Sequence, residues 1–441
     1  MSGKVGLVSL GCPKAMVDSE AILTQLASAG YASWGAVADA DVMIVNTCGF
    51  IDLARDESHA AIAAALDSHD KVIVTGCLGA DADALRSRYP RLLAVTGPQA
   101  AAAVVDAVRA ATPGEAGVEY LMGPAGIKLT PPHYAYLKIS EGCNHRCSFC
   151  IIPKMRGKLR SRPIGEVLSE AERLVDQGAR ELLVIAQDTS AYGVDLKYAE
   201  DRHRGRSLAS NLVTLVTELG KIAEWVRLHY VYPYPNVDDL IPLMVQGLAL
   251  PYLDIPLQHG SPRLLKAMRR PQSSDKTLQR IEKWRDACPE IVLRSTFIVG
   301  FPGETQADFE MLLAFLEEAQ LDRVGCFTYS DVEGAAANDF AGPIEESVKL
   351  DRQETLLELQ AAISARRLQR YVGTSQAVLI DHVDGDRATA RTRGDAPEID
   401  GTVTVRGARR LRPGEFIVVK IDGADEHDLF GRYVGKPLKI D

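Results

Sequence analysis

Residues 136–153 read YLKISEGCNHRCSFCIIP and decide how the centre of the chain is built. Residues 136–139 predict a short β-strand, and the loop directly after it carries three cysteines, Cys143, Cys147 and Cys150, in the spacing C-x3-C-x2-C. Functional groups of parallel α/β folds gather at the carboxyl ends of their strands. The stretch therefore predicts a parallel sheet with a three-thiol site at one edge.

The sequence after this loop continues the same pattern. Strand-like runs follow at 181–186, 226–230, 253–257, 292–299 and 324–328, and helical stretches such as 164–177 and 308–319 fit between them. Six βα repeats within residues 134–344 predict a (β/α) barrel that is short of the full eight. A charged, periodic stretch at 345–370 predicts a connecting helix.

The two ends of the chain predict two further domains. Residues 1–118 alternate short apolar runs at 5–10, 42–45 and 72–74 with helical stretches, as in a parallel βα domain, and 119–133 is rich in proline and glycine, as in a linker. Residues 371–441 hold short strands at 376–380, 387–392, 401–405 and 416–421, which predict a small all-β barrel. The expected fold class is thus α/β with a C-terminal β module.

Composition limits the possible functions. The 441 residues are 46% hydrophobic and 25% charged, as in globular proteins, and eight cysteines are too few for a disulfide scaffold. The N-terminus does not resemble a signal peptide and no apolar run is long enough to span a membrane, so we expect a cytoplasmic protein with reduced thiols and no membrane partner. A net charge of -9 disfavours a partner held mainly by phosphate contacts.

A first set of cysteines, Cys12, Cys48 and Cys77, lies in the N-terminal domain, one after each predicted strand. If the strands are neighbours, the three thiols converge at one edge of the sheet. Each could instead be a buried small apolar residue, but three matched positions favour a shared metal site. Structural zinc sites usually take four protein ligands, whereas three thiolates suit an iron-sulfur cluster that leaves one iron open.

The second set, in the loop quoted above, also offers three ligands. A zinc ribbon would need another cysteine pair, and Cys288 and Cys326 are too far apart to form one, so we interpret both as structural. Phe149 is expected to shield the site from solvent, and His145 is interpreted as a non-ligand. The neighbouring basic run predicts a solvated face, and the alternative is an anion-binding or substrate-orienting rim. Its members are Lys154, Arg156, Lys158, Arg160 and Arg162.

Several motifs together resemble one family. They are SLGCPK at 9–14 with VDSE at 17–20, NTCGF at 46–50, EGCNHRCSFCIIP at 141–153, and MRG at 155–157 with SRP at 161–163. They are similar to the radical S-adenosylmethionine methylthiotransferases, and the C-terminal module is similar to a TRAM domain. The resemblance covers essentially the whole chain.

The resemblance implies two 4Fe-4S clusters and S-adenosylmethionine as cofactors. The cluster on Cys143, Cys147 and Cys150 would bind S-adenosylmethionine for radical chemistry, and the cluster on Cys12, Cys48 and Cys77 would hold or deliver sulfur. Gln187, Gln258 and Arg294 follow or lie on barrel strands and are expected to contact the cofactor, although each could instead satisfy loop or barrel hydrogen bonds. No catalytic residue beyond the cluster ligands is predicted.

The resemblance further favours the branch of the family that modifies the β-carbon of an aspartate in small-ribosomal-subunit protein twelve. An acidic chain suits a basic ribosomal protein, and the β module is then expected to contact that protein or the ribosome. A flavodoxin- or ferredoxin-type electron donor is implied, and the sulfur donor is left open. The alternatives are a transfer-RNA adenosine methylthiotransferase and a non-catalytic iron-sulfur redox or sensor protein.

Overall fold

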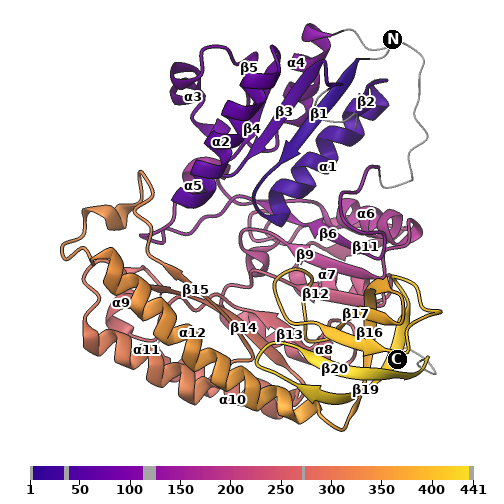
Figure 1. The fold of residues 1–441 in the computed structure, drawn as a ribbon, viewed down its shortest axis with the longest axis vertical. Coiled ribbons are helices and arrows are strands. Elements are labelled where there is room, and N and C mark those ends of the chain that lie inside the picture. The colour runs from indigo at the N-terminus through magenta and orange to yellow at the C-terminus, as the bar shows by residue number, and fades with distance from the viewer. Residues whose placement is uncertain (1–2, 34–38, 113–125, 271–273, 437–441) are drawn as a thin grey trace.

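The computed structural model describes residues 3–33, 39–112, 126–270 and 274–436. Figure 1 shows three parts: an N-terminal α/β domain at the top, a central curved sheet with its helices, and a C-terminal β module at the lower right. This confirms the predicted fold class. The first part of the expected linker, up to residue 125, lies outside the described residues.

The N-terminal domain is a five-stranded parallel sheet in the order β2-β1-β3-β4-β5. Alternate residues of its central strand point to opposite faces: Ile44 packs with helices α1 and α4, and Val45 packs with α2 and α3. Because both faces are covered, the residues of β3 and β4 are all buried and most of them are apolar. The elements are β1 Lys4–Ser9, α1 Pro13–Ser28, β2 Ala32–Ser33, β3 Val42–Thr47, α2 Asp52–Ser68, β4 Val72–Gly76, α3 Ala82–Arg88, β5 Ala94–Val95 and α4 Ala101–Ala111.

The central part is a sheet of six parallel strands in the order β15-β14-β13-β12-β9-β6, so each strand lies beside the next one along the chain. This is the partial barrel predicted from the βα repeats, and the largest apolar core of the chain lies between these strands and their helices. The strands are β6 Tyr134–Lys138, β9 Glu181–Ile185, β12 Trp225–Leu228, β13 Tyr252–Asp254, β14 Val292–Val299 and β15 Arg323–Thr328.

The helices of this part are α5 Ile152–Arg156, α6 Ile164–Asp176, α7 Leu212–Leu219, α8 Ile241–Val245, α9 Pro262–Ala267, α10 Ser274–Ala287, α11 Gln306–Ala319 and the connecting helix α12 Glu346–Leu368. Two short antiparallel pairs join them, β7 Ser140–Glu141 with β8 Arg160–Ser161, and β10 Glu200–His203 with β11 Arg206–Ala209. Short 3-10 segments cover Leu78–Ala80, Thr189–Ala191, Pro235–Leu240, Ala336–Asp339 and Gln369–Tyr371. No helix among the described residues is long and apolar enough to cross a membrane.

The C-terminal module is a closed five-stranded barrel in the order β16-β17-β18-β20-β19. Its strands are β16 Ser375–Asp384, β17 Arg387–Thr392, β18 Val403–Arg406, β19 Phe416–Ala424 and β20 Leu429–Gly435. The sequence predicted only four of them and missed β20, which contains Gly431. A Cβ atom at Gly431 would lie 2.4 Å from the carbonyl oxygen of Lys420, so the close approach of β19 and β20 requires glycine there.

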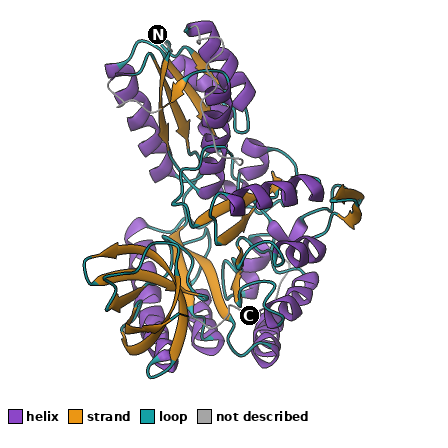
Figure 2. Cartoon of the chain, turned by 90° about the vertical axis from the view of Figure 1, so that its right-hand side faces the viewer, coloured by secondary structure: helices purple, strands orange, loops and turns teal. Residues whose placement is uncertain are grey.

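The two outer parts contact opposite ends of the central strands. At the amino ends, Trp225 packs against Phe416 of the module, with ring centroids 5.0 Å apart. At the other end, the Lys14 ammonium of α1 lies 3.3 Å from the ring centroid of Tyr230, which follows β12, and Asp18 of α1 pairs with Lys138, the last residue of β6. Figure 2 shows the same arrangement from the side. The N-terminal domain therefore covers the end of the barrel where the cysteine loop begins.

Candidate active site

The structure brings the three N-terminal cysteines together at the carboxyl edge of their sheet. Cys12 precedes α1, Cys48 directly follows β3, and Cys77 directly follows β4. A Cβ atom at Gly11 would lie 3.3 Å from the Sγ atom of Cys48, and the Cys77 amide donates to the carbonyl oxygen of Thr47 at 3.0 Å. Because β1, β3 and β4 are parallel neighbours, residues far apart in sequence become neighbours here.

The electrostatic surroundings of these three thiols differ. Burial raises the pKa of Cys12, but Lys14, nearby backbone amides and Arg156 outweigh it, so the pKa of this thiol lies below its usual value. Burial raises the pKa of Cys48 and of Cys77, although the positive charge of Arg156 opposes the effect at Cys77. Since the thiolate is the form that binds metal, two cations stand where a ligand set would need them.

The second set lies in the loop after β7. The Cys143 amide donates to the carbonyl oxygen of Gly157 at 3.1 Å, and the Cys150 amide donates to that of Cys147 at 3.2 Å. Gly142, the residue before the first cysteine, has φ +75, and a Cβ atom there would lie 2.2 Å from the carbonyl oxygen of Lys158. Only glycine fits this turn, which explains the Glu-Gly-Cys sequence.

Burial dominates the titration of the second set. It raises the pKa of Cys143 to about 11 and that of Cys150 to about 12, and it also raises the pKa of Cys147. Thiols in such surroundings stay protonated until a metal displaces the proton. The iron ions of a bound cluster would therefore supply the positive charge that stabilises the thiolates of this set.

All six cysteines are free, and each set groups thiols that influence one another's charge. Three sulfur ligands in each set suit an iron-sulfur cluster with one iron left open better than a structural zinc ion, which usually takes four protein ligands.

Polar and aromatic side chains support the second cysteine loop. The Nε2 atom of His145 lies 2.9 Å from Asp188 Oδ2 and 2.8 Å from the Tyr234 hydroxyl, and its ring stacks on Tyr232 with centroids 4.0 Å apart. The guanidinium of Arg270 lies 4.3 Å from the Tyr232 ring centroid. His145 is thus held by hydrogen bonds and stacking of its own, in keeping with its interpretation as a non-ligand.

The other predicted cofactor residues divide into two groups. Phe149 packs beside Phe301 and Tyr329 near the loop, and Gln187 donates to Glu141 Oε1 at 2.6 Å, two residues before Cys143. Gln258, with φ +74, is buried and continues β13 beside Phe297. These three stay near the end of the strands where the loop begins.

The position of Arg294 differs from the expected one at the carboxyl ends of the barrel strands. It is the third of the eight residues of β14, and its guanidinium lies 3.0 Å from Asp254 and 3.4 Å from Asp400 of the C-terminal module. The sequence predicted that Arg294 lies on this strand, but not whether it lies near the amino or the carboxyl end. The structure assigns Arg294 to the junction between the barrel and the module.

A buried network of charges that the sequence did not predict runs from Cys77 of the first set to Glu141, just before the second set. Arg156 donates through Nε to Cys77 Sγ at 3.2 Å and through Nη1 to Glu141 at 2.8 Å and to Asp18 at 3.3 Å. Lys138 forms ion pairs with Asp18 and, at 3.1 Å, with Glu141. Asp18, Glu141 and Arg156 all belong to the motifs that carried the family resemblance, which was the available signal.

The basic run therefore does not behave as one surface. Arg160 donates to Gln99 at an exposed position, and Lys154 donates to the carbonyl oxygen of Gly334. Arg156, by contrast, has a side chain that is only 1% exposed. The prediction of a solvated face was wrong for Arg156, because the N-terminal domain, which the run itself does not reveal, covers it.

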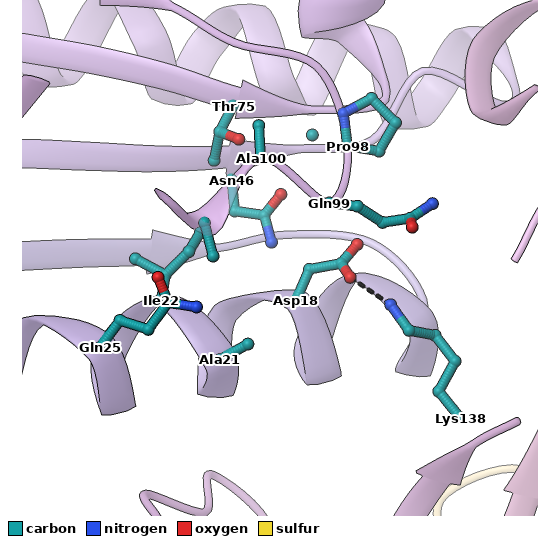
Figure 3. Close-up of a pocket in the computed structure, with 12 residues that line it drawn as sticks. Asp18, Ala21, Ile22, Gln25, Asn46, Thr75, Pro98, Gln99, Ala100 and Lys138 are labelled. Carbon is teal, nitrogen blue, oxygen red and sulfur yellow. Dashed lines mark hydrogen bonds and ion pairs between the residues drawn. The ribbon is translucent and has the colours of Figure 1, made fainter. Parts of the chain in front are cut away.

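A cavity of about 240 Å³ opens beside this network, at the carboxyl edge of the N-terminal sheet. Figure 3 shows Asn46, Thr75 and the Pro98–Ala100 segment on one side, and residues of α1 on the other. The Asp18–Lys138 ion pair closes one end of it. The cavity thus reaches Asp18 and Lys138, and Asp18 pairs with Arg156, which contacts Cys77.

The two remaining cysteines lie in the apolar core of the barrel. Cys288 and Cys326 are buried and belong to the main apolar core of the barrel, and the surroundings of Cys326 raise its pKa to about 12 by burial. These contacts agree with their interpretation as structural residues.

Family models match each of the three parts of the chain. Residues 137–316 match the radical SAM superfamily, residues 372–434 match the TRAM domain, and residues 4–97 match the uncharacterized protein family UPF0004. These matches coincide with the barrel, the β module and the N-terminal sheet.

Curated relatives match over nearly the full length. The chain is 59% identical over 431 residues to the ribosomal protein uS12 methylthiotransferase RimO of Methylobacillus flagellatus, which covers 97% of this chain and 98% of the relative. It is 58% identical over 433 residues to the protein of the same name from Alkalilimnicola ehrlichii, covering 98% of both.

Solved structures share the fold at low sequence identity. The radical S-adenosylmethionine methyltransferase TsrM from Kitasatospora setae, solved with cobalamin and a [4Fe-4S] cluster, matches with a TM-score of 0.52 and 14% identity. The match covers 74% of this chain and 75% of that chain. At this identity the likeness concerns the fold alone.

Proposed function

Because the chain belongs to the family of the ribosomal protein uS12 methylthiotransferase RimO, we propose that it is a radical S-adenosylmethionine enzyme that adds a methylthio group to uS12. The group replaces a hydrogen on the β-carbon of an aspartate. The observation that carries the proposal is near-full-length identity to relatives of that name. In this chain, one buried charge network contacts Cys77 of the first set and includes Glu141, two residues before the second set.

The second set, Cys143, Cys147 and Cys150, holds a 4Fe-4S cluster and with it S-adenosylmethionine, as the radical SAM superfamily does. When bound, these groups supply reductive cleavage of the sulfonium and removal of a hydrogen atom from an unactivated carbon. The first set, Cys12, Cys48 and Cys77, holds a second 4Fe-4S cluster and is the site of the transferred sulfur. Three sulfur ligands, uneven in pKa but close together, support this assignment.

The protein's own residues position and enclose these groups. Phe149 screens the second set from water, and Gln187 and Gln258 offer polar contacts to S-adenosylmethionine at the carboxyl ends of the strands. His145 and Tyr232 brace the loop by hydrogen bonding and stacking. The site is thus preorganised by packing before any ligand binds.

The partners follow from the proposed reaction. The acidic chain attracts uS12, a basic ribosomal protein, and the C-terminal module contacts uS12 or nearby ribosomal RNA. A flavodoxin- or ferredoxin-type protein delivers the electrons, and the reaction takes place in the cytoplasm, where ribosomes are.

The decisive experiment uses full-length protein reconstituted anaerobically with iron and sulfide, then supplied with reductant, S-adenosylmethionine and uS12. We expect 5'-deoxyadenosine and a uS12 mass gain that equals one methylthio group in place of one hydrogen. Cys147→Ala should abolish both, whereas Cys48→Ala should keep 5'-deoxyadenosine formation and lose the methylthio product. Product formation by the second variant would remove the first set from the mechanism.

The same assay separates the rival functions. A methylthio group on a transfer-RNA adenosine, with uS12 unchanged, would replace the proposed substrate. Clusters that form without any 5'-deoxyadenosine would instead identify a redox or sensor protein.

A further inference from the structure

Arg156 connects the two cysteine sets through contacts that neither set makes directly. Its Nε atom donates to Cys77 Sγ at 3.2 Å, and its Nη1 atom donates to Glu141 at 2.8 Å. Glu141 lies two residues before the second set begins, and Arg156 lies six residues after it ends. Both ends of the second loop therefore reach the first set through one guanidinium.

We propose that Arg156 is a positioning residue for the first cysteine set, and that it raises the reduction potential of the cluster held there by placing a buried positive charge and a hydrogen bond on Cys77. The proposal rests on the proposed function, since it requires a cluster on Cys12, Cys48 and Cys77. It goes beyond that function because it assigns redox control to a residue of the other domain.

The charge balance of the network supports this role. Arg156 and Lys138 face two carboxylates, Asp18 and Glu141, so the four groups are neutral without any thiolate. The Nη2 atom of Arg156 is buried and has no hydrogen-bond partner among the residues that the structure describes. The guanidinium thus has a donor left for a negatively charged group beside Cys77, beyond what its carboxylates need.

Glu141 fixes the guanidinium in this position. It accepts a hydrogen bond from Gln187 at 2.6 Å as well as from Arg156, and it pairs with Lys138. These contacts, with the one to Asp18, hold the guanidinium in one orientation, and an arginine side chain stays protonated in proteins.

The sign of the effect follows from electrostatics. Reduction adds one electron to a cluster that its thiolates already make negative. A fixed cation and a hydrogen bond to a ligand sulfur both stabilise the more negative state, and they do so strongly where water is excluded. Removing Arg156 should therefore make reduction of the first cluster harder.

The test measures the potential of the first cluster alone. Full-length protein with Cys143, Cys147 and Cys150 all replaced by alanine keeps only the first set, and its cluster is titrated against potential by electron paramagnetic resonance. In this background, R156M should lower the ratio of reduced to oxidised cluster at a fixed potential at least tenfold, which is about 59 mV for a one-electron couple.

R156K tests charge and geometry separately. A lysine ammonium keeps the charge but cannot reproduce the fork that reaches Cys77 and Glu141 together, so the potential should lie between those of R156M and the parent. R160M is the matched control, because Arg160 belongs to the same basic run but donates to the exposed Gln99. The potential of the R160M variant should equal that of the triple-alanine protein, which is the parent of all these variants.

Each outcome decides the proposal. Equal potentials in R156M and the parent would overturn it. If R156M does not fold, R156K decides, and a potential equal to that of the parent overturns the proposal. If the triple-alanine protein holds no cluster on Cys12, Cys48 and Cys77, the proposed function itself loses that cluster. The iron content of the triple-alanine protein reports this outcome separately.

Discussion

Replacing Glu181 by glutamine should loosen the C-terminal module from the barrel. Glu181, the first residue of β9, is completely buried between two arginines: Arg227 at 2.7 Å, which is also completely buried, and Arg391 of the module at 2.6 Å. The E181Q variant leaves these two guanidinium groups facing each other without a carboxylate. This carboxylate is therefore one of the charges that hold the module to the barrel, beside the Arg294–Asp400 pair.

The structure gives the size of the effect. Two hydrogen bonds to a charged group are weakened, each contributing about 1.5–3 kcal/mol. Arg391 keeps Asp381 and Arg227 keeps the carbonyl oxygen of Arg393, which limits the loss. Breaking one partner of a buried ion pair typically costs about 3–5 kcal/mol, and we expect E181Q to fall in this range. At about 1.4 kcal/mol per factor of ten, the undocked population should rise at least a hundredfold.

Trp225 makes the effect measurable, since it is buried at the junction against Phe416. Urea titration followed by its fluorescence, and native-state hydrogen exchange of amides in β16 and β17, should both report easier opening in E181Q. E290Q is the control, because Glu290 pairs with Arg393 of the same module at 3.8 Å but is 77% exposed, and such a pair contributes less than about 1 kcal/mol. A rise of the undocked population of less than tenfold in E181Q, or an equal rise in E290Q, would refute the prediction.

Three further outcomes follow from single features of the structure. Burial alone would raise the pKa of Glu181, but Arg391 and Arg227 outweigh burial and lower it. The stability that this carboxylate contributes should therefore be complete above its unfolded pKa of about 4.3 and be lost progressively as pH falls below that value. Acid titration of Trp225 fluorescence should show this loss in the unsubstituted protein but not in E181Q. G142A should lose iron from the second cysteine set, because the new Cβ atom would meet the Lys158 carbonyl oxygen at 2.2 Å; iron per chain and absent 5'-deoxyadenosine would show it. T305A removes the capping box at the start of α11 and should lower the unfolding free energy of the barrel by about 1 kcal/mol, and an unchanged urea midpoint would contradict this.

The sequence by itself determined the architecture and the placement of six cysteines at strand ends and in one loop. Alternating apolar runs and helices predicted both parallel sheets, because strand and helix periods are local properties of the chain. The cysteines could be placed at strand ends for the same reason, since parallel strands bring their carboxyl ends to one edge. Strand β20 escaped prediction because Gly431, a weak strand former, is required there by a neighbouring strand.

Only the tertiary structure decided which charges meet. Arg156 looked like one base in a solvated run, and it is buried because a separate domain covers it and offers Cys77 and Asp18. The sequence placed Arg294 on a barrel strand, and only the structure shows that its guanidinium lies between Asp254 and the module's Asp400. The physical reason is the same in both cases. Burial and the partner of a charged side chain depend on residues distant in sequence, which no local pattern encodes.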